Sequence, residues 1–177
     1  LYKRCDGWAA GLQLASLSLR ETHDYDKFVQ SFSGNIKDIA DYLAVTVLDQ
    51  QPESMREFLF DTAILDRFNA DLCNCLLDRL DCNVILQKLE SDNLFIVPLD
   101  QERKWYRYHP LFREFLLSQR SQAQKNRQDG LYYKASNWFK KHDHLGEAVD
   151  YALSANNMSA AAELIEQRAI QEFMDGR

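Results

Sequence analysis

One histidine in this chain stands where a helix start and several cations could bind an anion. Pro110 directly follows His109, and a helix accepts proline at its first position because no N–H is needed there. The first N–H groups of a helix lack partners within it, and the helix dipole favours negative charge at that end. Four basic residues lie within a few positions: Arg103, Lys104, Arg107 and Arg113. The pattern makes His109 the candidate ligand contact of the chain.

The residues alone leave two interpretations of this segment open. In the first, the imidazole contacts an anion and the basic residues contribute to the site. In the second, His109 caps its helix or packs under the preceding strands, and the basic residues form a solvated surface.

The segment before His109 is predicted to be a β-hairpin. Residues 94–97 include two β-branched side chains and an aromatic, 98–104 carry turn chemistry, and 105–108 alternate as a strand does. After Pro110, apolar side chains share one face of the predicted helix: Leu111, Phe112, Phe115 and Leu116. The hairpin and this helix are therefore the elements that position His109.

Helical periodicity dominates the sequence upstream of the hairpin. Residues 8–19, 25–32 and 36–47 predict a small helical bundle. Pro52 opens the next helix, 71–80 form another, and Asn83 is expected to cap a third that runs to about Ser91. One face of the Pro52 helix carries Met55, Phe58, Leu59 and Thr62. Three helices followed by a hairpin indicate a winged helix.

Downstream of about residue 120 the pattern changes to paired helices. Residues 131–141 and 146–155 predict one pair, and a third helix begins near Met158 after the break at Asn156 and Asn157. The period fits a tetratricopeptide-like solenoid. The predicted fold is mainly α: a small helical bundle over 1–50, a winged helix with one β-hairpin over 51–122, and the start of a TPR-like helical solenoid over 127–177.

Composition indicates a globular chain and argues against a membrane role. The 177 residues are 46% hydrophobic and carry a formal charge of −6, and no apolar run approaches the ~20 residues of a membrane helix. The chain begins at Leu1 without a signal pattern and stops directly after helix-like sequence, so we interpret it as an excised piece of a longer cytoplasmic protein.

Other residues that could do chemistry receive structural interpretations. The four cysteines, Cys5, Cys73, Cys75 and Cys82, lack metal-ligand spacing and are expected to be buried free thiols in a reducing compartment. His142 and His144 flank Asp143 in a predicted surface turn rather than a metal site. The tryptophans are expected in the core: Trp8, Trp105 and Trp138.

Four segments of the chain resemble the large bacterial MalT-like, LuxR-type ATP-dependent transcriptional activators. They are 7–15 (GWAAGLQLA), 93–100 (NLFIVPLD), 105–112 (WYRYHPLF) and 147–153 (EAVDYAL). The resemblance implies a nucleotide-binding domain upstream, a helical and winged-helix region here, a repeat domain that senses an inducer, and a C-terminal helix-turn-helix that binds DNA. The chain resembles the middle of such a protein.

This family is related to the NB-ARC signal-transduction ATPases, in which a winged-helix histidine touches the β-phosphate of ADP. The resemblance implies that role for His109 only, and Arg107 is an accessory candidate because it lies two residues before His109 among the basic residues. Relatives also place a Gly-x-Pro motif against the nucleotide base, but here Gln13 replaces the proline. The sequence has no G-x-x-x-x-G-K-[ST] phosphate loop, so ATP or ADP is expected in the intact protein and none bound to this segment, which should be non-catalytic.

Two functional classes follow from these observations. The first is a regulatory segment whose partners are the nucleotide-binding domain of the same chain and an inducer or protein on the repeats. The second is a winged helix that binds DNA directly, and there the third helix would read the DNA. Only Lys88 opposes Asp81, Glu90 and Asp92 in that helix, which weighs against the second class. A free-standing hydrolase lacks a clustered nucleophile and base.

Overall fold

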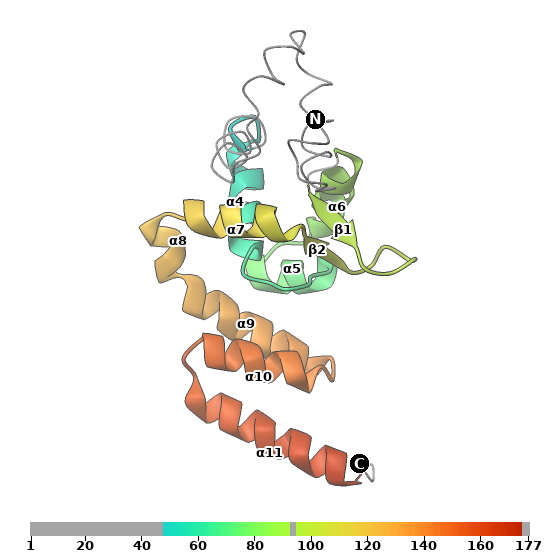
Figure 1. Cartoon of the computed structure of the whole chain (residues 1–177), viewed down its shortest axis with the longest axis vertical. Helices are drawn as coiled ribbons and strands as arrows, with labels where there is room; N and C mark the ends of the chain where they lie inside the picture. The colour runs from blue at the N-terminus through green and yellow to red at the C-terminus, as the bar shows by residue number, and fades with distance from the viewer. Residues whose placement is uncertain (1–47, 93–94, 175–177) are drawn as a thin grey trace, which may run out of the picture. The chain divides into compact units, whose positions relative to one another are not determined.

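A computed structural model describes residues 48–92 and 95–174 of the chain. Its contacts divide the chain into Leu1–Arg56 and Glu57–Arg177. The described part is mainly α, with eight helices and one two-stranded hairpin, which confirms the predicted fold class (Figure 1). The helices predicted within 8–47 lie outside the described residues, as do Cys5, Trp8 and Gln13.

Three helices, a hairpin and a fourth helix form the winged helix. In chain order they are α4 (Glu53–Thr62), α5 (Ala70–Leu77), α6 (Cys82–Ser91), β1 (Ile96–Pro98), β2 (Tyr106–Tyr108) and α7 (Pro110–Gln119). The predicted face of α4 is buried, because Met55, Phe58, Leu59 and Thr62 are all at most 8% exposed. The order predicted from the sequence is therefore confirmed for these elements.

Two helix ends in the winged helix differ from the prediction. The helix predicted over 71–80 stops at Leu77 because Asp78 adopts the left-handed conformation, with φ 53°. The predicted cap at Asn83 is wrong, since α6 begins at Cys82 and Asn83 lies in its first turn. Instead, the Asn74 side chain accepts a hydrogen bond from the Cys82 N–H at 3.1 Å, which satisfies one free N–H of the helix start.

The hairpin joins the core through the alternating side chains of β2. Ile96 pairs with Tyr108 and Pro98 with Tyr106, in antiparallel register. Tyr106 and Tyr108 are buried and Arg107 is exposed, as the alternation predicts. The hydroxyl of Tyr108 lies 2.7 Å from Thr62 Oγ1, which itself donates to the Phe58 carbonyl at 2.6 Å. The hydroxyl proton of Thr62 is already donated to the Phe58 carbonyl. The Tyr108 hydroxyl must therefore donate to Thr62 Oγ1.

This pair gives an unequal mutational response. Thr62→Val should cost about 1–3 kcal/mol because it leaves the Tyr108 hydroxyl buried without a partner, whereas Tyr108→Phe removes the donor and should cost only ~1 kcal/mol. Urea unfolding of both variants measures the difference. Tyr133→Phe, at a ring 51% exposed, is the matched control and should change nothing. Equal losses in the two core variants would contradict the assignment.

The helical repeats follow the winged helix. They comprise α8 (Gln122–Asn126), α9 (Gln128–Lys141), α10 (Leu145–Ser154) and α11 (Met158–Met174). The paired helices and the break before Met158 agree with the prediction, but α8 was not predicted. A capping box starts α8: Ser121 Oγ accepts from the Gln124 N–H, and the Gln124 side chain accepts from the Ser121 N–H.

Small residues allow the repeat helices to approach closely. Ala135 and Ala148 are fully buried between α9 and α10, and Ser136 Oγ donates to the Ala148 carbonyl at 2.7 Å.

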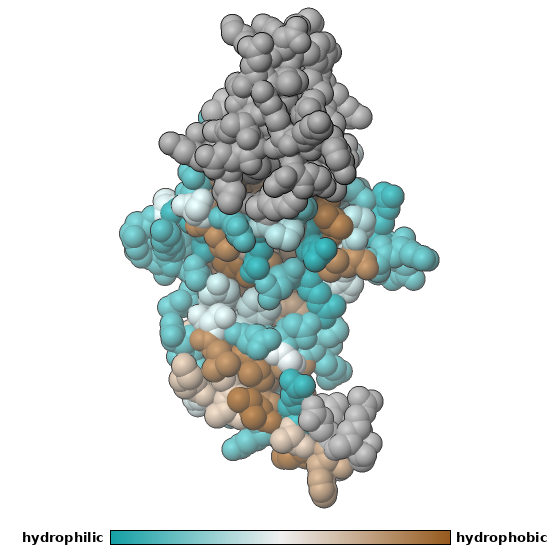
Figure 2. Space-filling view, in the orientation of Figure 1, coloured by the Kyte–Doolittle hydropathy of each residue, from teal (hydrophilic) through white to brown (hydrophobic). Residues whose placement is uncertain are grey.

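Apolar side chains are exposed over α11: Met158, Ile165, Ile170 and Phe173 (Figure 2). None of the helices within 48–92 and 95–174 combines the length and the hydropathy of a membrane-spanning segment.

Candidate functional site

His109 lies at the N-cap position of α7, with Pro110 as the first helical residue. Its N–H donates to the Phe95 carbonyl at 2.7 Å, and its carbonyl accepts from the Arg113 N–H at 3.0 Å. The half-buried imidazole makes no capping hydrogen bond. The backbone of His109 is thus fixed at both ends, while its ring nitrogens have no hydrogen-bond partner among the residues that the structure describes.

Phe95 holds His109 in this position, and sequence reasoning missed it. Its φ is 55°, a conformation that costs a bulky aromatic residue about 1–3 kcal/mol. Its ring is buried and lies 5.1 Å from the ring of Phe112, in the first turn of α7. The strained residue therefore fixes the start of α7 twice, through its carbonyl and through its ring. The sequence offered no glycine or turn signal for this conformation.

The electrostatics of His109 favour a neutral ring. Burial lowers the pKa of His109 below its usual value, and the positive charge of Arg107 lowers it further. A neutral imidazole carries one N–H donor and one acceptor nitrogen. An anion beside the ring would act in the opposite direction and raise the pKa.

The other basic residues near His109 contact different groups. Arg103 pairs with Glu90 at 2.8 Å, and Lys104 pairs with Glu102 at 2.5 Å. Arg113 donates to the carbonyls of Ala63 and Ile64 at 2.9 and 3.1 Å and pairs with Asp66. Three of the four basic residues expected near His109 therefore have partners of their own. Arg107, which is exposed, has no partner among the described residues.

A groove between α5, α6 and the hairpin turn bears on direct DNA binding. Its volume is about 470 Å³, and it is lined by Asn69, Ala70, Asp71, Asn83, Gln87, Glu90, Glu102, Arg103, Lys104 and Tyr106. Both basic side chains are paired with acids of the same groove, Glu90 and Glu102. Asp71 adds a further negative charge, so this face does not offer free cations to a phosphate backbone.

The described cysteines are free, but they are not all buried. Cys73 and Cys82 are buried, whereas Cys75 is exposed, so the expectation of four buried thiols is wrong for Cys75. Its position two residues after Cys73 turns it to the opposite face of α5. Within the described ranges, no group of three histidine, cysteine or acidic side chains could hold a metal ion.

These environments predict different thiol reactivity. Burial raises the pKa of Cys82 to about 11 and also raises that of Cys73, so neither thiol should ionise near neutral pH. In a Cys5→Ser background, a thiol-reactive disulfide reagent should label Cys75 promptly and the other two only after unfolding. The same protein should contain no stoichiometric zinc by mass spectrometry. Prompt labelling of all three cysteines would contradict this assignment.

His142 and His144 contact aromatic side chains in the α9–α10 turn. The exposed His142 ring stacks on Trp138 at 3.8 Å, and its Nδ1 lies 2.8 Å from the Trp138 carbonyl. His144 is half-buried, with its ring edge-on to Trp105 at 6.0 Å. Trp138 is in the core as predicted, whereas Trp105 is only half-buried.

Comparison with known proteins gives a family and a set of relatives. Residues 44–128 match the family model of the MalT winged helix domain. The chain is 34% identical over 162 residues to the serine/threonine-protein kinase PknK of Mycobacterium tuberculosis (strain H37Rv), covering 92% of the chain and 15% of the kinase. It is 30% identical over 173 residues to the HTH-type transcriptional regulator MalT of Vibrio campbellii and to that of Vibrio cholerae, covering 97% of the chain and 19% of each regulator. The chain thus spans less than a fifth of the length of these relatives.

Proposed function

This chain belongs to the MalT-like regulators, and we propose that it is a non-catalytic regulatory segment. Its role would be to couple the nucleotide state of the protein to the binding of an inducer or a protein partner. In this proposal the winged helix responds to ATP or ADP held by a nucleotide-binding domain of the same longer, cytoplasmic protein. The repeats respond to an inducer or a protein partner. DNA would be bound by a separate C-terminal domain.

The observation that carries the proposal is the imidazole at the start of α7, which has no hydrogen-bond partner within 48–92 and 95–174. The half-buried ring of His109 forms no capping hydrogen bond and stands beside helix N–H groups, an arrangement suited to a phosphate. Arg107, exposed on the adjacent strand, can add a long-range favourable charge. We therefore propose His109 as the contact to the ADP phosphate and Arg107 as an accessory.

The range of relatives supports regulation rather than chemistry. The similar segment occurs both in a protein named as a kinase and in proteins named as transcriptional regulators, and it is a small part of each. A segment common to proteins with different outputs is better suited to controlling an output than to producing it. We propose this shared controlling role for the present chain.

Hydrogen exchange of the intact protein with and without ADP tests the proposal. ADP should slow the exchange of amides in residues 106–113, because a bound phosphate would use the N–H groups at the start of α7. The amides of α11 serve as the internal control, and their exchange rates should be the same with and without ADP. If ADP binds and leaves 106–113 unaffected, the nucleotide contact lies elsewhere.

Direct DNA binding is the alternative function, and the acidic groove argues against it. We expect the 177-residue chain to bind neither duplex DNA nor ATP, because its net charge is −6, its groove cations are paired, and its sequence lacks a phosphate loop. Electrophoretic shift and calorimetric titration at low salt measure both. Binding of DNA at micromolar concentration or tighter would favour the alternative, and equally tight binding of ATP would contradict the expectation that nucleotide is held by another domain.

A further inference from the structure

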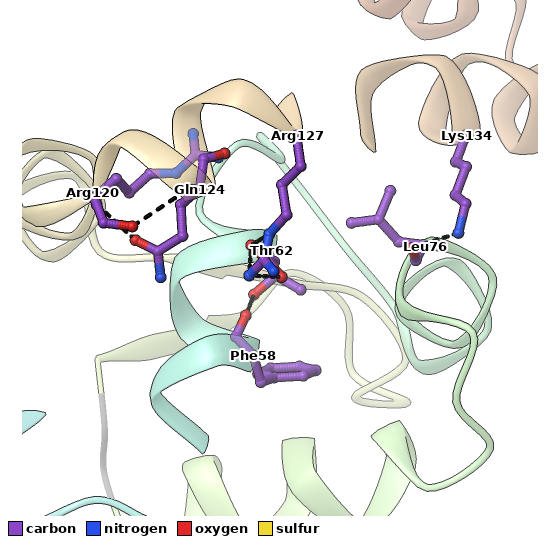
Figure 3. A network of polar contacts seen from close by, with 9 residues as sticks. Phe58, Thr62, Leu76, Arg120, Gln124, Arg127 and Lys134 are labelled. Atoms are coloured by element: carbon purple, nitrogen blue, oxygen red, sulfur yellow. Dashed lines mark hydrogen bonds and ion pairs between the residues drawn. The ribbon is translucent and has the colours of Figure 1, made fainter. Parts of the chain in front are cut away.

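Charged side chains join the repeats to the ends of two winged-helix helices (Figure 3). Arg127, between α8 and α9, donates to both carboxylate oxygens of Asp61 at 2.8 to 3.1 Å. The Asp61 side chain is only 10% exposed, so this contact is largely shielded from water. Lys134 of α9 donates to the Leu76 carbonyl at 3.2 Å and pairs with Asp78, at the end of α5. The two contacts fix the first half of α9 against α4 and α5.

A second set of contacts fixes the other end of the same helix pair. Asp71, in the first turn of α5, accepts a hydrogen bond from Trp138 Nε1 at 2.9 Å. Arg67 forms an ion pair with Glu147 of α10. The Asp66 N–H donates to the Tyr151 hydroxyl at 2.9 Å. The contacts therefore extend along α9 and α10 rather than meeting at one hinge point.

Trp105 brings the hairpin into this junction. The Arg67 guanidinium lies 4.3 Å from the centre of its ring, a cation–π contact. On the repeat side the ring lies 6.0 Å from the ring of Trp138, edge-on, and is stacked on that of Phe139 at 6.4 Å. The next residue, Tyr106, is buried in the winged helix. The strand that leads to His109 is thus held by the repeats on one side and by the winged-helix core on the other.

We infer that the winged helix and the α9–α10 pair form one cooperative unit, with Trp105 as the residue that positions the hairpin against the repeats. A force on the repeat pair then reaches β2 directly, without passing through a flexible linker. The cooperative unit follows from the contacts alone. Its consequence for nucleotide binding, a repeat-dependent position of His109, rests on the proposed function.

Native-state hydrogen exchange of the 177-residue chain in low urea tests the inference. In the unmodified chain, amides of α5 and of α9–α10 should open in the same event, with the same urea dependence. A junction variant, Arg67→Gln with Asp71→Ala and Arg127→Gln, should make α9–α10 exchange at least about tenfold faster relative to α5, since it removes charged and hydrogen-bonded contacts that join the two regions. Trp105→Ala should have the same direction of effect.

The matched control is Arg79→Gln. It removes a bidentate Arg79–Asp81 pair of 2.8 Å contacts, but this pair is local to the α5–α6 connection. It should leave the relative exchange of α5 and α9–α10 unchanged.

Two results would overturn the inference. One is separate opening of α9–α10 in the unmodified chain, which needs no variant and holds even if the junction variants fail to fold. The other is an equal acceleration of both regions in the junction variant, which would mean that the contacts add stability without coupling. Neither result bears on whether ADP protects residues 106–113 in the intact protein, so the proposed function is tested independently.

Discussion

Replacing His109 by alanine in the intact protein should weaken ADP binding about ten- to a hundredfold. A hydrogen bond to a charged partner contributes roughly 1.5–3 kcal/mol, and the alanine variant loses that bond to the phosphate. The protein should remain folded, because the hairpin and α7 are held by Tyr108 and Phe112, which are buried. Calorimetric titration with ADP measures the loss. Unchanged ADP affinity in a folded variant would show that His109 has only a structural role.

The same variant should raise transcription in the absence of inducer. We propose that the protein exchanges between a closed resting form and an open form and that ADP favours the closed form, so weaker ADP binding should shift the population toward the open form. Reporter expression without inducer measures this shift. Arg107→Gln is the control, because an exposed charge that forms no hydrogen bond in the described part of the chain should change ADP affinity only a few-fold.

The pH dependence of ADP binding gives an independent check. Burial and Arg107 lower the pKa of His109 in the free protein, and a bound phosphate should raise it. Binding would then take up protons, so ADP affinity attributable to His109 should increase as pH falls through the pKa of the bound state. The His109→Ala variant should lose this part of the pH dependence.

The second large effect is expected at the buried carboxylate of the junction. Arg127→Ala should lower the free energy of unfolding by about 2–3 kcal/mol at neutral pH, because it leaves Asp61 buried without its cation. This value is set below the range for fully buried pairs, since Arg127 itself is 46% exposed. Asp61→Asn should cost less, about 1 kcal/mol, because the released Arg127 can be solvated.

Acid should partly rescue the Arg127→Ala variant. Burial raises the pKa of Asp61 despite the opposing effect of Arg127, so the folded state binds a proton more tightly than the unfolded state. The favourable contribution of Asp61 is therefore fully present below its unfolded pKa and is lost as pH rises through its folded pKa. Without Arg127 the folded pKa should rise further, and the stability deficit should shrink toward acidic pH. Urea unfolding across this range measures the deficit, and a deficit independent of pH would contradict the assignment.

Local patterns were sufficient to predict much of the fold. The alternation of 105–108 and the proline after His109 are features of neighbouring residues, and both the hairpin and the start of α7 were confirmed. The missed helix α8 also had a local signal, the Ser121-x-x-Gln124 capping box. The early end of α5 depends on a left-handed Asp78, for which the sequence has no glycine or asparagine signal.

The surroundings of the candidate site could not be predicted in the same way. The Arg113 guanidinium donates to the carbonyls of Ala63 and Ile64, about fifty positions earlier in the chain. Its closeness to His109 in the sequence suggested that the guanidinium belongs to the anion site, whereas only the backbone N–H of Arg113 contacts His109. Cys75 was judged by residue type, yet its exposure depends on which face of α5 packs inward. Such properties belong to tertiary packing, where the partners are far apart in sequence.

Position 95 needs a residue that tolerates a left-handed backbone and also a large ring that packs on Phe112, and these two requirements conflict. Glycine, asparagine or aspartate would relieve the backbone but remove the ring that packs on Phe112, and other bulky residues would keep the strain. A tolerated replacement therefore needs a second change at Phe112 that fills the lost volume. We therefore expect positions 95 and 112 to change by coordinated double substitutions rather than by single steps.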